Sequence, residues 1–316
     1  MTRFWSIVRR ATPWLLVLLV SIAIGVAWKL IRDPLCILRS TAGVNINNAS
    51  NDPDDPSLSL YISGANGLRM ASWHSRFLGE IDTLKISGTD LPIAAIIAIC
   101  RSKNIRSVSV FGPSVDNSLI LVLSGKEDLQ SFDGSGSQIT DISLLLTECN
   151  ELSSLILSGC ALSNSSMTRQ RRETLLIHTL YLPGCDEPIK GLKAVIEDSP
   201  KIRRISVSGD RNVESLIAVV QPLDYLAISD CHITGDLART LTASVTSREL
   251  YIDKLSGDTD CICRLCHLAS VVTIGRYLNE ERPDLLASLR AAGVVSQVSE
   301  NVIAPWMEDW RGDPAR

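Results

Sequence analysis

The chain has 316 residues, of which 45% are apolar but only 5% aromatic, and its formal net charge is −4. A core drawn from Leu, Ile, Val and Ala suits thin, regularly layered packing better than a globule centred on large rings. Basic and acidic residues are mixed along the chain, so it lacks the concentrated basic face that nucleic-acid binding needs, and nucleic acid is excluded as a partner.

The N-terminal region contains a charge-free stretch, WLLVLLVSIAIGVAW, over residues 14–28. A membrane-spanning helix needs roughly 20 mostly apolar residues, and residues 11–31 supply them with tryptophans near both ends, where interfacial rings prefer to sit. We therefore predict a short basic tail over 1–10 and a transmembrane helix or signal anchor over 11–31. A cleaved signal peptide stays the alternative, because it shares the basic start and the apolar stretch.

Three arginines, Arg3, Arg9 and Arg10, and the amino terminus precede this segment, whereas Lys29, Arg32 and Arg39, partly offset by Asp33, follow it. The positive-inside bias slightly favours a cytoplasmic N-terminus, so the body is expected on the extracytoplasmic side. Residues 41–57 are rich in Asn, Asp and Pro and nearly free of large apolar side chains. We predict a flexible stalk over 32–56, because such a composition buries too little surface to fold.

A short pattern then recurs through most of the chain. Its marker, usually a Ser-Gly pair, advances in steps of 24, 24, 24, 23, 25, 25, 21 and 24 residues, and the marker slot holds Gly64, Gly88, Gly112, Gly136, Gly159, Gly184, Gly209, Asp230 and Lys254. The apolar positions keep one form, L-x-x-L-x-L-x-x-C-x-L, which is complete in Leu152, Leu155, Leu157, Cys160 and Leu162. A fixed period of this length indicates a repeat architecture.

Each repeat contains two kinds of periodicity. The L-x-L core alternates with period two, which predicts a short strand. The segments 93–100, 142–149, 189–196 and 213–220 carry apolar residues at spacings of three and four, which predicts short helices. One strand and one helix cannot close a core alone, so neighbouring repeats must stack. We predict an α/β solenoid of about ten repeats over 57–298, with a parallel concave sheet and convex short helices, followed by a C-terminal tail over 299–316.

This pattern resembles the leucine-rich repeat family, whose signature is L-x-x-L-x-L-x-x-N/C-x-L in repeats of 20 to 29 residues. The solenoid resembles the ribonuclease-inhibitor type, and the N-terminal segment resembles that of bacterial membrane-anchored members. This resemblance implies that the concave sheet recognises a protein without a cofactor. In that family the N/C slot faces inward and hydrogen-bonds to the turning backbone. The predicted structural ladder in this slot comprises Thr89, Ser137, Cys160, Cys185, Asp210 and Cys231.

Two copies depart from the pattern. Gly134 replaces an inward leucine, so we expect a thinner core in the fourth copy. Residues 161–176 lose the helical apolar pattern and contain three arginines, which predicts an irregular or mobile convex segment.

The stretch CICRLCH, from Cys261 to His267, is the strongest candidate for metal or redox chemistry. Cys and His are the usual zinc donors. On a helix, however, Cys263, Cys266 and His267 share one side while Cys261 points away, and no second C-x-x-C exists. The favoured interpretation is that these thiols pack inward. The alternative is an exported repeat protein with a metal or redox site near 261–267.

Outward positions of the predicted strands indicate where a partner binds. Most are small or hydroxylic, but from the sixth to the ninth copy they become Tyr181, Arg204, Tyr225, Glu249 and Tyr251. Because parallel strands lie about 4.8 Å apart, these five predict one contiguous patch about 15 Å wide. Tyr and Arg are enriched among residues that dominate binding energy. The alternative is that the tyrosines merely cover a sheet face.

Catalytic motifs such as G-x-S-x-G, the P-loop and G-x-G-x-x-G are absent from the sequence, and its four histidines lie in different repeats. We therefore predict no enzymatic activity and no cofactor. The sequence favours a membrane-anchored binding or scaffolding module with a protein partner. A structural envelope component without a specific ligand is a further interpretation.

Overall fold

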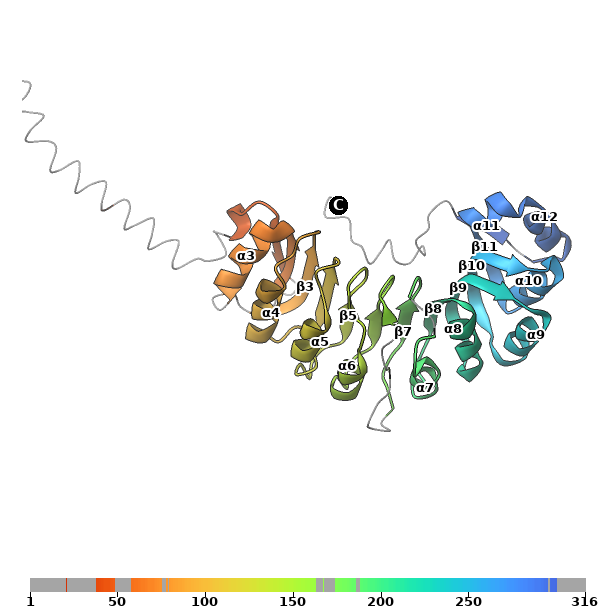
Figure 1. The fold of residues 1–316 in the computed structure, drawn as a ribbon, viewed down its shortest axis with the longest axis horizontal. Coiled ribbons are helices and arrows are strands. Elements are labelled where there is room, and N and C mark those ends of the chain that lie inside the picture. Colours follow the sequence, from red (N-terminus) through yellow and green to blue (C-terminus); the bar gives the residue numbers. More distant parts are fainter. Residues whose placement is uncertain are drawn as a thin grey trace, which may run out of the picture.

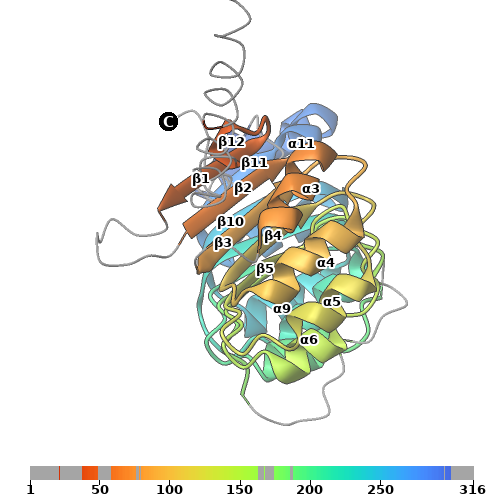
Figure 2. The ribbon, with the colours of Figure 1, turned by 90° about the vertical axis from the view of Figure 1, so that its left-hand side faces the viewer.

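The computed structural model describes residues 21, 38–48, 58–75, 78, 80–162, 167, 174–185, 188–294 and 296–299. They form a curved α/β solenoid in which the sheet lines the concave side and short helices cover the convex side (Figure 1). Figure 2, turned by 90°, shows helices α3 to α6 stacked in a layer beside the strands that precede them. The predicted fold class is confirmed at this level: one long, mostly parallel sheet with short helices.

Twelve strands form this sheet in chain order. They are β1 Val44–Asn48, β2 Leu58–Ser63, β3 Ile81–Ser87, β4 Ser107–Phe111, β5 Ser131–Asp133, β6 Ser154–Ile156, β7 Thr179–Leu182, β8 Arg204–Ser208, β9 Leu223–Ile233, β10 Ser247–Gly257, β11 Ala269–Gly275 and β12 Ser296–Ser299. The helices are α3 Gly64–His74, α4 Ile93–Ser102, α5 Asn117–Leu123, α6 Ser143–Glu148, α7 Leu192–Glu197, α8 Asp210–Glu214, the 3-10 helix η3 Ser215–Ala218, α9 Gly235–Ser244, α10 Thr259–Cys266, α11 Arg276–Glu281 and α12 Pro283–Ala291.

The register of the sheet follows the repeat. Leu84 of β3 lies opposite Leu60 of β2 and Val108 of β4, so equivalent apolar residues form rows that face the helices. These rows are fully or almost fully buried and merge with the inner faces of the helices into one continuous core. Each repeat therefore completes the core of its neighbour. This is expected for a solenoid, in which a repeat contacts only the repeats next to it.

The folded domain begins earlier than predicted. β1 pairs antiparallel with β2, with Val44 opposite Ile62, and Leu38 is completely buried. The range 32–56 predicted as a stalk therefore contains a part, 38–48, that packs against the first repeat. The signal was present in the sequence, because the apolar Val44 and Ile46 alternate with Asn45 and Asn47. In the structure Val44 and Ile46 are buried, while Asn45 and Asn47 are exposed.

The fourth copy does not have the thinner core expected from Gly134. Phe132 is completely buried and its ring fills the space that the leucine would occupy. A Cβ added to Gly134 would lie 2.9 Å from Phe132 Cζ and 3.0 Å from Ile139 Cδ1. The expectation was wrong because a larger side chain two residues earlier compensates for the glycine.

Several predicted segments fall outside the description. The basic tail 1–10 and the C-terminal tail 299–316, except its first residue, are not described, and of the predicted anchor 11–31 only residue 21 is. Over the part of the chain that is described, no helix combines the length and the apolar character that crossing a bilayer requires. Most of the predicted irregular segment 161–176 is likewise outside the described residues.

Candidate functional site

The structure brings the five predicted contact residues together on the concave face of β7 to β10. Arg204, Tyr225 and Glu249 lie directly opposite one another on three consecutive strands. Tyr181 and Tyr251 lie in the adjacent row, two residues further along their strands, with Ser206 and Ala227 between them. The five therefore form a two-row patch, which we call the tyrosine patch.

The three tyrosines of this patch are buried, a feature that the sequence did not indicate. Tyr181, Tyr225 and Tyr251 are only 8%, 5% and 6% exposed, and with Ile156 and Ala227 they form a hydrophobic cluster separate from the main core. Their burial makes the rings a rigid base for the site.

The charged members of the tyrosine patch stay exposed. Arg204 and Glu249 flank Tyr225 on the two neighbouring strands, and both side chains face solvent. Two strand spacings of about 4.8 Å separate them, so charges of opposite sign lie about 10 Å apart.

A cavity of about 470 Å³ opens beside the patch on the concave face. Its wall is made of backbone glycines, hydroxyls, the three tyrosines and charged groups: Phe111, Ser135, Gly136, Ser158, Gly159, Tyr181, Pro183, Gly184, Ser206, Tyr225, Ala227, Ser229, Asp230, Tyr251, Asp253 and Lys254. Gly136 and Gly159 have left-handed φ angles of 67° and 66°, and a Cβ there would meet no atom within 4 Å. The missing side chains keep the cavity wide.

One end of the cavity is charged because two repeats have a charged residue at the position where the earlier repeats have glycine. Asp230 and Lys254 occupy the left-handed slot with φ angles of 49° and 47°, although this region costs a non-glycine residue roughly 1–2 kcal/mol. Lys254 Nζ lies 3.5 Å from Asp230 Oδ1 and 5.0 Å from the centre of the Tyr277 ring. The sequence already indicated this feature, since these two residues break the row of glycines.

Asp253 is a further residue of this site that sequence reasoning missed. Asp253 is 3% exposed, and its carboxylate accepts a hydrogen bond of 3.1 Å from the Leu278 amide in the first turn of α11. A Cβ on Gly275 would lie 2.3 Å from Asp253 Cγ, so this glycine leaves the room that the carboxylate needs. The alternating strand pattern gives no sign of a buried acid at this position.

The Tyr251 hydroxyl is positioned as a donor. Burial raises the pKa of Tyr251, and the neighbouring Asp253 carboxylate raises it further, so the phenol stays protonated at neutral pH. The Asp253 carboxylate acts on this hydroxyl both through its charge and as a hydrogen-bond acceptor. Tyr251 also lines the cavity, so its hydroxyl lies at the cavity wall beside a buried acid.

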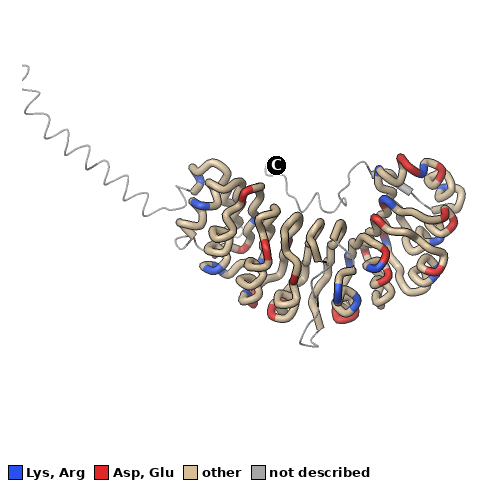
Figure 3. Tube along the Cα trace, in the orientation of Figure 1, with Lys and Arg blue, Asp and Glu red and all other residues tan. Residues whose placement is uncertain are grey.

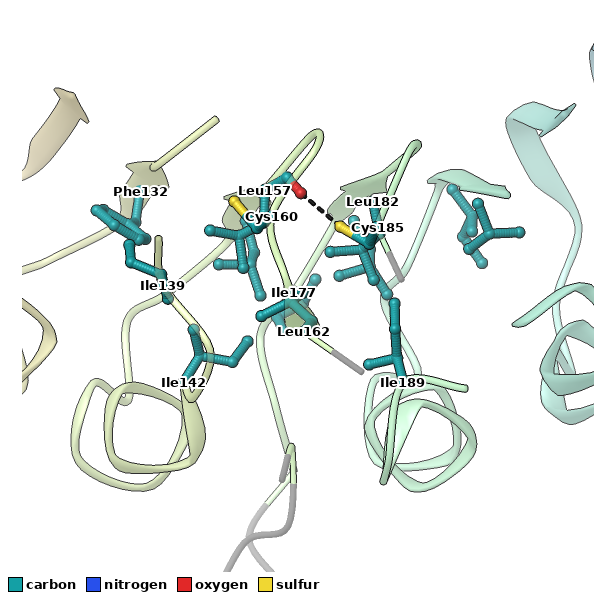
Figure 4. Close-up of a cluster of buried hydrophobic side chains, with 14 of the residues drawn as sticks. Phe132, Ile139, Ile142, Leu157, Cys160, Leu162, Ile177, Leu182, Cys185 and Ile189 are labelled. Atoms are coloured by element: carbon teal, nitrogen blue, oxygen red, sulfur yellow. Dashed lines mark hydrogen bonds between the residues drawn. The ribbon is translucent and has the colours of Figure 1, made fainter. Parts of the chain in front are cut away.

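Four of the six predicted ladder residues are buried: Ser137, Cys160, Cys185 and Cys231. The Cys160 thiol donates to the Gly134 carbonyl at 3.2 Å, and the Cys185 thiol donates to the Leu157 carbonyl at 2.7 Å (Figure 4). Each bond joins one repeat to the preceding one. The structure thus places these thiols in a structural position between repeats.

The other two predicted ladder residues, Thr89 and Asp210, are exposed. Asp210 still links repeats, since its carboxylate accepts a 2.6 Å hydrogen bond from the His232 amide. The buried position is taken by Asn212, which accepts from the Ile189 amide at 2.9 Å and donates to the Ser208 carbonyl at 2.8 Å. The sequence misplaced this ladder residue because the turn after β8 starts a helix, α8, at Asp210.

Replacing Cys160 with alanine is expected to lower the free energy of unfolding by about 1 kcal/mol, the value of a lost buried hydrogen bond, and to leave partner binding intact. Burial raises the pKa of Cys160, so the thiol keeps the proton that it donates. Urea denaturation measures the loss, and Cys160→Ser, which keeps a donor, serves as the control. Loss of binding without loss of stability would contradict the structural role.

The cysteine-rich segment lies on α10. Cys266 is fully buried, Cys261 and Cys263 are partly buried against the core, and His267 is exposed. All three thiols are free, and burial, with Cys263 as the second cause, raises the pKa of Cys266 to about 12. Metal ligation and redox chemistry both use thiolates. Within the described ranges, no group of three or more His, Cys, Asp or Glu side chains is arranged to hold a metal ion.

Comparisons with known proteins add no family to this picture. A scan against protein-family models gives no match, and a search of curated proteins gives none either. The chemistry of the concave site is therefore inferred from its own residues.

Proposed function

We propose that the chain is a membrane-anchored leucine-rich repeat protein whose concave sheet binds a protein partner. The repeat period of 21 to 25 residues supports the family assignment. Buried Cys and Asn side chains that bond backbone groups of neighbouring repeats support it too, because N/C is the residue choice of that repeat signature. The extracytoplasmic side is proposed for the body from the charge flanking residues 11–31.

The observation that carries the binding function is the tyrosine patch beside the 470 Å³ cavity. On β4 and β5 the outward residues are short, namely Ser107, Ser109, Ser131 and Asp133, whereas Tyr61 of β2 and Lys85 of β3 lie in the same outward row as Ser109. Aromatic rings held rigidly next to exposed charges are typical of surfaces that dominate protein recognition. An open groove across several strands favours an extended polypeptide over a small, enclosed ligand.

Affinity capture from detergent-solubilised native membranes tests this function. Wild-type chain should retain a specific protein that the variant Arg204→Ala with Tyr225→Ala loses, whereas the matched variant Ser107→Ala with Ser109→Ala should retain it. A structural component without a specific ligand would capture the same proteins in all three forms.

The exported repeat protein with a metal or redox site near 261–267 is not favoured by any specific observation. The raised pKa of Cys263 and Cys266, caused first by burial, favours protonated thiols at neutral pH. Elemental analysis of the purified chain decides this alternative, since a stoichiometric metal would support it and overturn the packing role.

Deleting residues 1–32 should give a soluble protein that melts cooperatively. The deletion removes the proposed anchor and spares Leu38 and β1, which belong to the folded domain. A deletion of residues 1–48 is the control, and it should aggregate or melt at lower temperature, because it exposes the edge of β2. Calorimetry with size-exclusion chromatography measures both forms. If the shorter deletion aggregates as well, the domain boundary is wrong.

A further inference from the structure

The convex surface of the first repeats exposes apolar side chains. Trp73 of α3 is 74% exposed and Leu121 of α5 is 66% exposed. Between them α4 presents Ala94 and Ala98 to solvent. A shallow groove of about 490 Å³, lined by Trp73, Pro92 and the outer alanines of α4, joins α3 to α4. Contiguous exposed apolar surface on a soluble domain indicates an interaction site.

The charge on these helices is one-sided. The sequences of α3, α4 and α5 contain no Asp or Glu, while Arg69 and Arg101 are exposed on α3 and α4. In contrast, α9, α10, α11 and α12 each contain at least one acidic residue. Figure 3 shows acidic residues in red on these C-terminal helices. Exposed acidic residues lie in the segments that flank these helices, such as Asp90, Asp116 and Asp128, but the helices themselves present apolar and basic side chains, which suits an anionic lipid surface.

This surface lies next to the point where the chain arrives from the proposed anchor. Six residues separate position 31 from Leu38, so the end of the anchor lies at most about 25 Å from the buried Leu38. Helix α3 packs directly on the turn that follows Leu38 and contains Gly43, since a Cβ on Gly67 would lie 3.2 Å from the Gly43 carbonyl oxygen. Trp73 is on the same helix, about 9 Å further along its axis.

We infer that the convex faces of α3, α4 and α5 lie on the lipid bilayer that holds the anchor. This inference rests on the proposed membrane anchor. Trp73 takes the interfacial position that tryptophan prefers, the alanines of α4 lie flat on the headgroup region, and Arg69 and Arg101 contact lipid phosphates. The solenoid is thereby held on its side at the membrane, and the concave face with its tyrosine patch points away from the lipid.

The test uses the full chain in nanodiscs of phosphatidylcholine and phosphatidylglycerol that contain a diazirine-bearing phospholipid. After photolysis, mass spectrometry measures the lipid adducts on each helix. Peptides of α3 to α5 should carry at least fivefold more adduct than peptides of α9 and α10. Trp73→Asp with Leu121→Asp should remove most of this labelling. The matched control is Val220→Asp, because Val220 is 84% exposed on the segment after η3, away from the anchor; it should leave the labelling unchanged.

Three outcomes overturn the inference, and they differ from one another. Equal labelling of the N-terminal and C-terminal helices overturns the docked orientation alone, with the anchor intact. Crosslinks from α3 to α5 into a second copy of the chain identify that surface as a dimer interface instead. A chain that is washed from the membranes by alkaline carbonate has no integral anchor, so the proposed function loses its membrane part together with the docking.

Discussion

Replacing Phe132 with alanine is expected to lower the free energy of unfolding by about 3–5 kcal/mol, the usual cost of deleting a buried ring. Phe132 is 0% exposed and is among the largest fully buried side chains. Its ring fills its own place in the core and also the place left empty by Gly134. Its loss therefore opens a larger cavity than the loss of the equivalent side chain in another repeat. Urea denaturation measures the change. The matched control, Val108→Ala in β4, occupies the equivalent row and should cost less.

A double-mutant cycle at these two positions tests the compensation. Gly134→Ala alone should destabilise the protein by about 1–3 kcal/mol, because the new Cβ overpacks against the Phe132 ring. Phe132→Leu removes the Cε1 and Cζ atoms that lie 3.1 Å and 2.9 Å from that Cβ. The double variant should therefore be more stable than the sum of the single effects predicts, by at least about 0.5 kcal/mol. Strict additivity would show that the ring does not replace the missing side chain.

Replacing Arg204 and Tyr225 together with alanine should weaken partner binding at least tenfold, about 1.4 kcal/mol. Arg204 supplies an exposed charge, and Tyr225 supports the neighbouring rings of the tyrosine patch. The partner loses a charged contact and a rigid apolar base in one variant. Surface plasmon resonance with the captured partner measures the change.

The control for this loss has two parts. Ser107→Ala with Ser109→Ala changes the concave face of β4 and should alter binding little. Arg204→Ala alone separates recognition from folding, because Arg204 is exposed and its removal should weaken binding without lowering the melting temperature. Equal losses of binding from the arginine and serine variants would reduce the tyrosine patch to ordinary surface.

The repeat period predicted the fold class from sequence alone. The alternation of inward residues predicted which side chains of each strand face the core and which face the concave surface. The same alternation put the five patch residues on the concave face, where the structure places them. These features depend on neighbours in the sequence and in adjacent repeats, and both follow directly from the period. The tyrosine patch was therefore within reach of pattern analysis.

Features that depend on specific side-chain packing were not predictable. Burial of Tyr225 and Tyr251 arises from contacts between strands about 25 residues apart in the sequence. The periodicity of one strand contains no information about such contacts. Asn212 replaces Asp210 in the buried slot because α8 begins early. Phe132 fills the gap beside Gly134 through a choice of side-chain size. Each case is a local departure from the repeat that only three-dimensional packing reveals.

Site-specific photocrosslinking in intact cells tests the central claim, binding through the concave face, most directly. A benzophenone amino acid replaces Arg204 or Glu249 on the concave face, and Arg239 on the convex helix α9 in the control. All three positions are exposed, so the label does not disturb the core. We predict one adduct of the same mass from both concave positions and none from position 239. Adducts from position 239 alone, or the same adducts from all three positions, would contradict binding through the concave face.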